Sequence, residues 1–498
     1  MRPFITTKRK ANFYFHTILS FGHGIVFLLF LLFFCLSCTA PKIATTSNAL
    51  SNNQSPNFVV IFTDDLGYGD LSCFGNPTIK TPHLDRMATE GQKWTQFYVA
   101  DPVCTPSRAG LMTGRYPIRN GMSSAKRVVL FPDSAGGLPA EEVTIAEVLK
   151  QKNYATAAVG KWHLGHLPEY LPIAQGFDSY YGIPYSNDMD FVKGSPNYRK
   201  EGKKDPNFLA NISAYNVPLM QDATIIERPA DQNTITRRYT EKAVEFIKSN
   251  KNQPFFLYLA HSLPHIPLFA HPDFIGSSKR GIYGDVIQEI DWSVGQVLQT
   301  LRDLQLDKNT IVVFSSDNGP WLSFHTHGGS AGPLRAGKGT TFEGGQRVPT
   351  IFWGGEIKPG IIDEMGSTLD LINTFAALSG TSIPNDRKMD SYDLSPILLG
   401  QTSKSPRVEF HYWTRAKLHA VRSGKWKLHI LQREPINYGK AVKLERPELY
   451  DLETDISEKY DKFDTEPAKV AELKAMIAAH KADVADAMPD NLAARIEK

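Results

Sequence analysis

The stretch N-F-V-V-I-F-T, residues 57–63, is a mostly apolar run that ends directly before Asp64 and Asp65. A short run of this kind, rich in β-branched and aromatic side chains, predicts a strand that is buried on both faces. Strands of that kind are typical of parallel sheets that helices cover on either side. The stretch therefore predicts an α/β fold and places two acidic side chains at the carboxyl end of one strand.

Similar stretches recur along the chain and alternate with helical patterns. They are A-T-A-A-V-G (155–160), F-F-L-Y-L-A (255–260), T-I-V-V-F-S-S (310–316) and P-T-I-F-W-G (349–354). Apolar residues spaced three and four apart predict a helix over 282–304. Another helix is predicted over 81–91, where Thr81 can cap the first turn and Gly91 can end it. This alternation predicts a large, mostly parallel sheet sandwiched by helices.

The pattern changes after about residue 385. Segments 419–430 and 449–452 resemble short antiparallel strands, and residues 466–485 predict a closing helix. We interpret residues 56–384 as the catalytic domain. Residues 385–498 are interpreted as a smaller C-terminal α+β subdomain with a short antiparallel sheet. Residues 186–232 are polar and irregular, which predicts a loop insertion over one face.

The N-terminus has the character of an export signal. Four basic residues precede twelve apolar residues, Ile25 to Leu36, and Cys38 follows them before a polar stretch. Twelve apolar residues are too few to span a bilayer comfortably but suit the core of a signal peptide. We interpret residues 1–37 as a signal peptide of the lipoprotein type, Cys38 as the lipidated residue and 38–55 as a flexible linker.

This interpretation predicts an exported protein, in the periplasm or at the outer membrane or cell surface of a bacterium. Ordinary secretion and an uncleaved anchor are the alternatives to lipidation. Membrane attachment is expected only through a lipid on Cys38.

Charge and cysteine content narrow the function further. The formal net charge is +3, and three minus the four basic residues of the leader leaves −1 for the mature chain. A near-neutral protein offers no electrostatic basis for binding nucleic acid. Outside the leader region only Cys73 and Cys104 remain, so at most one disulfide can form and stability depends on the core.

Polar side chains gather where the predicted strands end, and ligands of open α/β sheets bind at that edge. Asp64 and Asp65 follow one strand, and Asp317 and Asn318 follow another. Three converging carboxylates would repel each other unless a cation neutralised them. An all-oxygen set of this kind suits calcium or magnesium better than zinc. The alternative is that each pair only forms a turn at a strand end.

Two further strands run into histidine-containing segments. G-K-W-H-L-G brings Lys161 and His163, which in an extended segment would point to the same side. H-S-L-P-H-I-P brings His261 and His265, the second held between prolines. The alternative is that these are exposed or internally bonded loop residues.

Cys104 opens the segment C-T-P-S-R-A-G-L-M-T-G, which predicts a helix. Pro106 fits the first turn, so Cys104 lies at the helix N-terminus, where the macrodipole favours negative charge by about 0.3–1 kcal/mol. Arg108 falls on the same face one turn later. Both the helix N-terminus and Arg108 would stabilise a negatively charged oxygen at position 104. The alternative is a buried inert thiol, which would need neither of these groups.

C-T-P-S-R followed by A-G-L-M-T-G-R resembles the signature of the formylglycine-dependent type I sulfatases of the alkaline phosphatase-like superfamily. N-F-V-V-I-F-T-D-D-L-G-Y-G-D, G-K-W-H-L-G, S-S-D-N-G, G-K-G-T-T-F-E-G-G and L-Y-D-L-E-T-D resemble further blocks of that family, in the family's order. G-I-P-Y-S-N-D-M (182–189) resembles the arylsulfatase A-like branch. The resemblance runs from about residue 56 to 465. It departs at His83, where asparagine is expected.

The resemblance implies a calcium ion, with magnesium as the less favoured ion, and a modified nucleophile. The metal ligands would be Asp64, Asp65, Asp317 and Asn318, completed by the modified Cys104. A formylglycine-generating maturation enzyme would oxidise Cys104 to formylglycine (3-oxoalanine). The hydrated residue is a geminal diol, in which one hydroxyl attacks sulfur and the second later expels sulfate.

The resemblance also implies roles for the surrounding side chains. Arg108, Lys161 and Lys338 would neutralise the sulfate oxygens and the developing charge. Asp317 could accept the proton of the attacking hydroxyl. His265 or Lys338 would donate a proton to the leaving oxygen, and His163 would take the proton that drives sulfate release.

Weaker assignments concern the substrate. Ser186 is expected to touch the sulfate or to position Lys161. His325, His327 and Arg335, in the Gly-rich loop 322–339, are candidate substrate contacts, with solvated loop residues as the alternative.

The sequence thus predicts an arylsulfatase-like sulfuric ester hydrolase. The expected substrates are sulfated polysaccharides or oligosaccharides, such as algal ulvan or host glycans. A phosphoester or phosphonate-ester hydrolase of the same superfamily and a non-catalytic glycan-binding relative are the alternatives.

Overall fold

The computed structural model describes residues 55–196, 200, 203–433, 441–485 and 489–496. The predicted signal peptide, Cys38 and almost all of the predicted linker lie outside these residues. Within the described part of the chain, no helix is long and apolar enough to cross a membrane.

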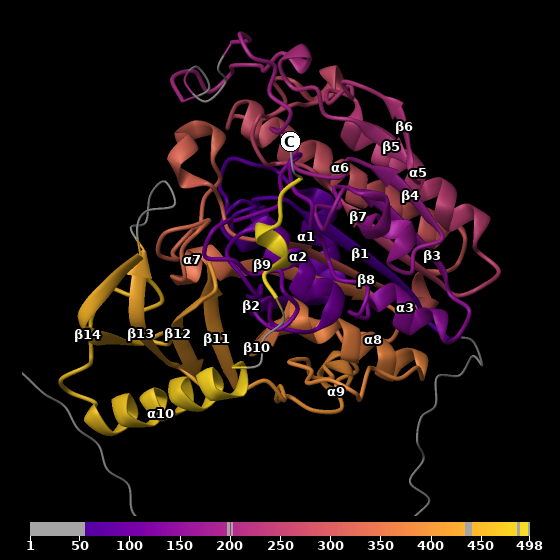
Figure 1. Cartoon of the computed structure of the whole chain (residues 1–498). Helices are drawn as coiled ribbons and strands as arrows, with labels where there is room; N and C mark the ends of the chain where they lie inside the picture. Colours follow the sequence, from indigo (N-terminus) through magenta and orange to yellow (C-terminus); the bar gives the residue numbers. More distant parts are fainter. Residues whose placement is uncertain (1–54, 197–199, 201–202, 434–440, 486–488, 497–498) are drawn as a thin grey trace, which may run out of the picture. The chain divides into compact units, whose positions relative to one another are not determined.

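A ten-stranded sheet forms the centre of the fold, in the order β10-β2-β9-β8-β1-β7-β3-β4-β5-β6 (Figure 1). Its strands are β1 (Asn57–Thr63), β2 (Gln92–Tyr98), β3 (Ala155–Gly160), β4 (Ser179–Gly182), β5 (Leu219–Gln221), β6 (Thr224–Glu227), β7 (Phe255–Ala260), β8 (Thr310–Ser316), β9 (Arg347–Gly354) and β10 (Gly360–Ser367). Strands β8, β1, β7, β3 and β4 run parallel, and β9 is antiparallel to its neighbours β8 and β2. This confirms the predicted α/β class.

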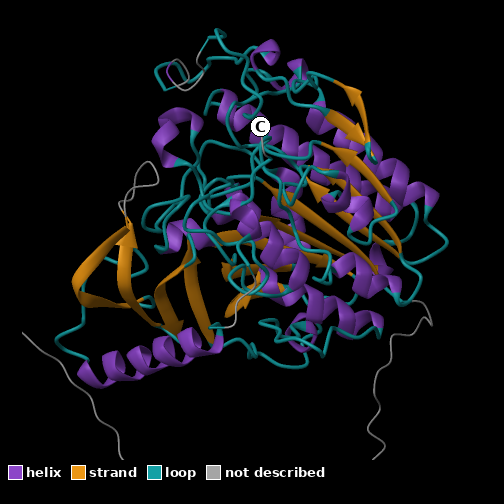
Figure 2. Ribbon diagram, in the orientation of Figure 1, coloured by secondary structure: helices purple, strands orange, loops and turns teal. Residues whose placement is uncertain are grey.

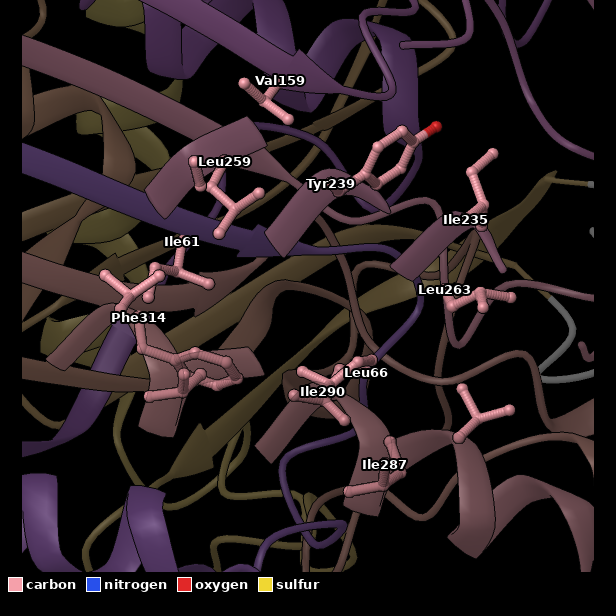
Figure 3. Packing of buried hydrophobic residues seen from close by; sticks show 14 of the residues in the cluster. Ile61, Leu66, Val159, Ile235, Tyr239, Leu259, Leu263, Ile287, Ile290 and Phe314 are labelled. Atoms are coloured by element: carbon pink, nitrogen blue, oxygen red, sulfur yellow. The ribbon is translucent and has the colours of Figure 1, made fainter. Parts of the chain in front are cut away.

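Strand β1 alternates its side chains between two hydrophobic layers, because successive residues of a strand point to opposite faces. On one face Val59 and Ile61 pack with helices α1 (Pro82–Glu90), α5 (Ile235–Ser249) and α6 (Ile282–Asp303). Figure 3 shows Ile61, Leu259 and Phe314 of three strands near Ile287 and Ile290 of α6. Every residue of β1 is buried, as a strand covered on both faces requires.

The other face of the sheet is covered by a second set of helices. Phe58, Val60 and Phe62 pack there with α2 (Cys104–Thr113), α3 (Ile145–Lys150), α8 (Leu371–Ser379) and α9 (Ser395–Leu398). The two layers hold β1 rigidly, and β1 carries the acidic pair that follows it.

A separate four-stranded antiparallel sheet follows in the chain, in the order β11-β12-β13-β14 (Figure 2). Its strands are β11 (Glu409–Thr414), β12 (Lys417–Ser423), β13 (Trp426–Arg433) and β14 (Ala441–Asp451). Helix α10 (Pro467–Asp483) packs on it through Leu473 and Ile477, in a cluster that includes Tyr98 and Tyr116 of the preceding part. This confirms the predicted small antiparallel sheet.

A buried ionic cluster connects this small sheet to the segment before β9. Lys427 of β13 lies 2.9 Å from Glu343 of α7 (Glu343–Gln346) and 2.9 Å from Glu458, and all three side chains are 0% exposed. Tyr98 and Tyr412 donate hydrogen bonds to Glu343. Burial alone would raise the pKa of Glu343, but Lys427, Arg347 and Arg422 together outweigh it and hold that pKa well below its usual value.

Three local expectations were wrong. The insertion 186–232 is not irregular throughout, because β5 and β6 within it extend the edge of the large sheet. These strands are three and four residues long and β6 is largely exposed, so they leave no buried run in the sequence. Thr81 precedes α1 but its side chain does not cap the helix, and Asp291 instead accepts from the backbone N–H groups of His83 and Leu84.

The third error concerns the segment after β3, which is not extended as expected. His163 has a φ of +60°, in the left-handed region, and Gly160 a φ of +112°. Lys161 and His163 are nevertheless both buried, so the turn rather than an extended strand orients them.

Candidate active site

Strands β1 and β8 bring the two acidic pairs together. The strands are parallel neighbours with Thr63 opposite Ser316, so the residues that follow leave the sheet side by side. The backbone N–H of Asp65 donates to Asp317 Oδ1 at 3.1 Å, and Asn318 Nδ2 donates to Asp65 Oδ1 at 2.7 Å. Asp65 has a φ of +65°, a conformation that aspartate adopts more readily than most residues.

The ends of β3 and β7 add the cationic and imidazole groups. Lys161 is anchored by its backbone N–H to Ala260 O at 2.7 Å, and its ammonium group pairs with Asp64. Its Nζ also donates to Ser186 Oγ at 3.2 Å. His265 Nε2 lies 3.5 Å from the same Ser186 oxygen, so these side chains converge on one point.

Cys104 lies at the N-terminus of α2, as predicted, and its side chain faces the acidic pairs. Its Sγ is 3.3 Å from Asp64 Oδ1 and 3.5 Å from Lys338 Nζ, and the residue is only 2% exposed. Gly339 N–H donates to Pro102 O at 2.9 Å, which fastens the loop that carries Lys338 beside Cys104.

Arg108 connects the helix to the acidic site. Its Nε donates to Asp317 Oδ2 at 3.0 Å, and its Nη2 forms an ion pair with the same oxygen at 2.8 Å. Its Nη1 donates to Lys161 O at 2.9 Å and to Tyr258 OH at 3.3 Å. The guanidinium is fully buried, so Arg108 both fixes the geometry and supplies permanent positive charge.

The charges of the site balance each other. Three carboxylates (Asp64, Asp65 and Asp317) face three cations (Arg108, Lys161 and Lys338), and all six side chains are buried. Burial raises the pKa of Asp65 to about 7, although Lys338, 2.6 Å away, opposes the shift. Burial alone would also raise the pKa of Asp64, but Lys161, His265, Arg108 and Lys338 outweigh it and hold that pKa well below its usual value.

The Cys104 thiol is not activated as a thiolate. Burial, together with the negative charges of Asp317 and Asp64, raises its pKa well above the usual value despite the nearby lysines. Since the thiolate is the nucleophilic form of cysteine, an unmodified Cys104 is a poor nucleophile in this setting.

Two buried oxygens identify where a cation would fit. Among the described residues, Asp65 Oδ2 and Asn318 Oδ1 have no hydrogen-bond partner, although both are buried. Ligand atoms of Asp64, Asp65, Cys104 and His265 all lie within 4.8 Å of one another. Carboxylate and amide oxygens left free in this way fit a hard divalent cation.

The hydrogen bonds of the two histidines determine which ring nitrogen carries the proton. Nε2 of His163 lies 2.9 Å from Leu130 O and donates to it, whereas its buried Nδ1 lacks a partner in the described part of the chain. Nδ1 of His265 faces Ile266 O at 2.5 Å and Asn187 Oδ1 at 3.1 Å, so Nδ1 carries its proton. Burial first, and then the neighbouring lysines, lower both histidine pKa values well below normal.

A cavity of about 400 Å³ opens above Cys104. Predicted residues His163, Ser186, His265 and Lys338 line it, together with an apolar rim that the sequence did not predict. The rim consists of Val128, Val129, Phe131, Met189, Phe191 and Trp321. Apart from Met189, which ends the block 182–189, no motif marks these residues, because they come from separate loops that only the fold brings together.

The three loop residues predicted as substrate contacts do not line this cavity. His327 Nε2 lies 2.8 Å from Asp205 O, and Arg335 donates to Glu458 O at 2.6 Å. His325 is exposed and has a φ of +52°. Their role in binding stays a prediction.

The family models place the chain among known proteins. The model described as Sulfatase matches residues 56–381, which is more than half of the chain. The chain belongs to the sulfatase family. A second model, the C-terminal region of aryl-sulfatase, matches residues 405–495. This confirms the family predicted from the motifs and makes the protein a sulfuric ester hydrolase.

Individual sulfatases resemble the chain over most of its length. Human (Homo sapiens) arylsulfatase A is 42% identical over 433 residues, which cover 82% of this chain and 83% of the relative. The crystal structure of Ps i-CgsB in complex with k-i-k-neocarrahexaose is 31% identical with a TM-score of 0.72, covering 89% of this chain and 96% of that one. A sulfatase from a glycosaminoglycan metabolism locus of Bacteroides thetaiotaomicron is 31% identical with a TM-score of 0.73, covering 86% and 100%.

Proposed function

We propose that this sulfatase hydrolyses sulfate esters of polysaccharides or oligosaccharides with a formylglycine made from Cys104 and one bound calcium ion. The observation that carries the proposal is the position of Cys104 Sγ beneath the cavity, 3.3 Å from Asp64 and 3.5 Å from Lys338. The unmodified thiol is poorly suited to attack, whereas the hydrated aldehyde of formylglycine supplies a hydroxyl nucleophile.

Asp64, Asp65, Asp317 and Asn318 would hold the metal, with the modified Cys104 completing its ligands. A bound divalent ion polarises the sulfate group and stabilises the charge that develops during transfer. It also changes the balanced charge of the site to a net +2, which favours an anionic sulfate group. The all-oxygen donors and the unsatisfied Asp65 and Asn318 oxygens support calcium, with magnesium as the alternative.

The cations of the site bind and orient the sulfate. Lys161 and Lys338 would contact the sulfate oxygens, and Ser186 would hold Lys161 in position through their 3.2 Å contact. Arg108 keeps Asp317 in place and adds charge without leaving its buried bonds.

Proton transfers can be assigned from the hydrogen-bond partners. Lys338 is the protonated group beside the cavity, since His265 presents the nitrogen that carries no proton. Lys338 therefore donates a proton to the leaving oxygen of the substrate, which departs as an alcohol. His163 Nδ1, buried and lacking a bond within the described chain, takes the proton whose removal accompanies sulfate release.

The proposal of a glycan substrate has two supports. Of the two solved structures at 31% identity, one comes from a locus for glycosaminoglycan metabolism and the other holds a bound neocarrahexaose. The apolar rim of the cavity, including Trp321 and Phe131, offers a surface for the C–H face of a sugar ring.

We further propose that the protein is exported and held at the bacterial envelope by a lipid on Cys38, with residues 1–37 as the signal peptide. Labelling of the expressed protein with a radioactive fatty acid tests this. Loss of label and of membrane association in Cys38→Ala is expected, and equal labelling of both forms refutes lipidation.

Sulfate release from a panel of defined sulfated oligosaccharides tests the function, using protein co-expressed with a maturation enzyme. An aldehyde-reactive probe should label the wild type, and Cys104→Ala should lose both label and activity. Matched phosphate esters test the alternative, a phosphoester hydrolase. Faster hydrolysis of the phosphate ester than of the matching sulfate ester would refute the proposed sulfate specificity. Full activity without any aldehyde would refute formylglycine.

A further inference from the structure

A second hollow adjoins the cavity above Cys104. It has a volume of about 500 Å³, and its wall shares Val128, Phe131 and Pro132 with the wall of the first cavity. A ligand seated over Cys104 can therefore continue into the second hollow along a shared apolar surface.

The second hollow is positively charged. Lys126, Arg127 and Arg495 line it together with a single acid, Asp133, so three positive charges minus one negative leave +2. Lys126 and Arg495 are exposed to solvent. Charge of one sign in a hollow attracts ligands of the opposite sign, here an anion.

Arg127 is the residue that makes the hollow more than a group of surface charges. Its side chain is only 9% exposed, one of its nitrogens pairs with Asp133, and its guanidinium lies 4.8 Å from the ring centre of Phe131. Its Nη1 has no hydrogen-bond partner in the described parts of the chain. Buried guanidinium groups normally satisfy their donors, so Asp133 compensates the positive charge of Arg127 only in part, and the remainder acts on the hollow.

The segment that carries these charges is fastened to the active site. The backbone N–H of Leu130 donates to Thr105 Oγ1 at 3.2 Å, beside Cys104, and Leu130 O accepts from His163. Arg127 precedes Leu130 by three residues, so their Cα atoms are at most about 11 Å apart. The hollow is thus held at a fixed, short distance from the reacting centre, within reach of the neighbouring residue of one oligosaccharide.

We infer that the hollow lined by Lys126, Arg127 and Arg495 binds a second anionic group of the substrate, a sulfate or carboxylate on a neighbouring residue of the same glycan. This inference rests on the proposed function and narrows its substrate to polyanionic glycans. The sulfate over Cys104 is cleaved, and the second anion contributes binding only.

The test uses Lys126→Gln/Arg495→Gln, which removes two exposed charges and leaves the Arg127–Asp133 pair in place. Three synthetic galactan tetrasaccharides serve as probes; they share one sulfate ester and carry a second sulfate, a carboxylate or a hydroxyl on the adjacent residue. The control, Lys248→Gln/Lys251→Gln, removes two exposed charges at and just after the C-terminal end of α5, neither of which lines the hollow. Both double variants are made in the wild-type and in the Cys104→Ala protein. In the Cys104→Ala protein binding is measured without turnover.

The Lys126/Arg495 variant should bind the doubly anionic probes about tenfold more weakly by calorimetry, while affinity for the hydroxyl probe stays within twofold. The ratio of the sulfate and carboxylate probes identifies the preferred anion. The inference would be overturned if the Lys126/Arg495 variant bound all three probes equally more weakly, or bound none of them more weakly. It would also be overturned if the control variant had the same effect, or if the Cys104→Ala protein bound no probe. Hydrolysis of p-nitrophenyl sulfate should not change. Absence of sulfate release by the wild type from both p-nitrophenyl sulfate and the defined oligosaccharides would refute the proposed function separately.

Discussion

Replacing Lys427 by methionine tests whether the buried ionic cluster holds the small sheet to the catalytic part. Lys427 is the shared cation of Glu343 and Glu458, at 2.9 Å from each, and its ammonium lies 3.9 Å from the ring centre of Tyr412. Methionine fills a similar volume but removes the shared ammonium group from two buried carboxylates, which keep only Arg347 at 3.4 Å from Glu343 and His429 at 2.8 Å from Glu458. Removing one partner of a buried pair costs about 3–5 kcal/mol, so we expect the free energy of unfolding to fall by that amount.

The matched control is Lys425→Met, two residues earlier. Lys425 pairs with Asp451 at 2.8 Å, but its side chain is 36% exposed, so solvent screens the pair and the expected loss is much smaller. Urea denaturation followed by tryptophan fluorescence compares the two variants. If both lose less than about 1 kcal/mol, the argument from burial is wrong.

A double variant isolates the cause. Glu458→Gln removes one of the two carboxylates that lose Lys427, so Lys427→Met/Glu458→Gln should be less destabilised than the sum of the single changes. Glu343 N–H also donates to Glu458 at 2.7 Å, and Glu343 lies five residues after Lys338. We therefore expect Lys427→Met to lower kcat/KM as well, and unchanged activity would show that the loop of Lys338 does not depend on this cluster.

Three further predictions concern the site and the core. Lys338→Met should slow hydrolysis of sugar sulfates far more than that of p-nitrophenyl sulfate, because a good leaving group needs no proton; equal losses would refute Lys338 as the donor. Removing the metal with a chelator should lower Tm, since a ligand at 100 times its Kd stabilises by about 2.7 kcal/mol; an unchanged Tm would argue against a resident ion. Burial raises the pKa of Glu289 to about 7. As the pH rises from about 4.5 to 7, the Glu289 carboxyl loses its proton in the unfolded chain before it does so in the folded protein, so the free energy of unfolding falls over this range. Glu289→Gln should remove this loss, gaining up to ~3 kcal/mol relative to the wild type at pH 8 and nothing at pH 4; a constant difference across that range would contradict the shift.

The buried strands were predictable because their residues are apolar on both faces. Segments 57–63 and 310–316 match β1 and β8 residue for residue. Strand β2 was not predicted, since Q-K-W-T-Q-F-Y mixes polar and apolar side chains. Its polar residues find partners that lie far away in the sequence, such as Gln92 with the backbone of Ile397, and local pattern cannot reveal them.

The residues that converge at the candidate site were predictable from motifs, but their surroundings were not. Asp64, Asp317 and Cys104 meet because parallel strands end at one edge, which topology alone implies. The left-handed backbone of Asp65 and His163 is set by contacts across the site, and the sequence shows no sign of it. The apolar rim and the charged hollow depend on where the loops 126–133 and 186–191 fold, so no spacing rule could have found them.

The burial of Cys104 limits the time during which this residue can be modified after its synthesis. Lys338, which closes over the thiol, is synthesised 234 residues later. At roughly 5–20 residues per second, the cysteine stays uncovered for roughly 10 to 50 s before that lysine exists. A maturation enzyme would have to act within this interval or soon after it, while the chain is still being synthesised. In the folded protein Cys104 is only 2% exposed and its sulfur is no longer accessible.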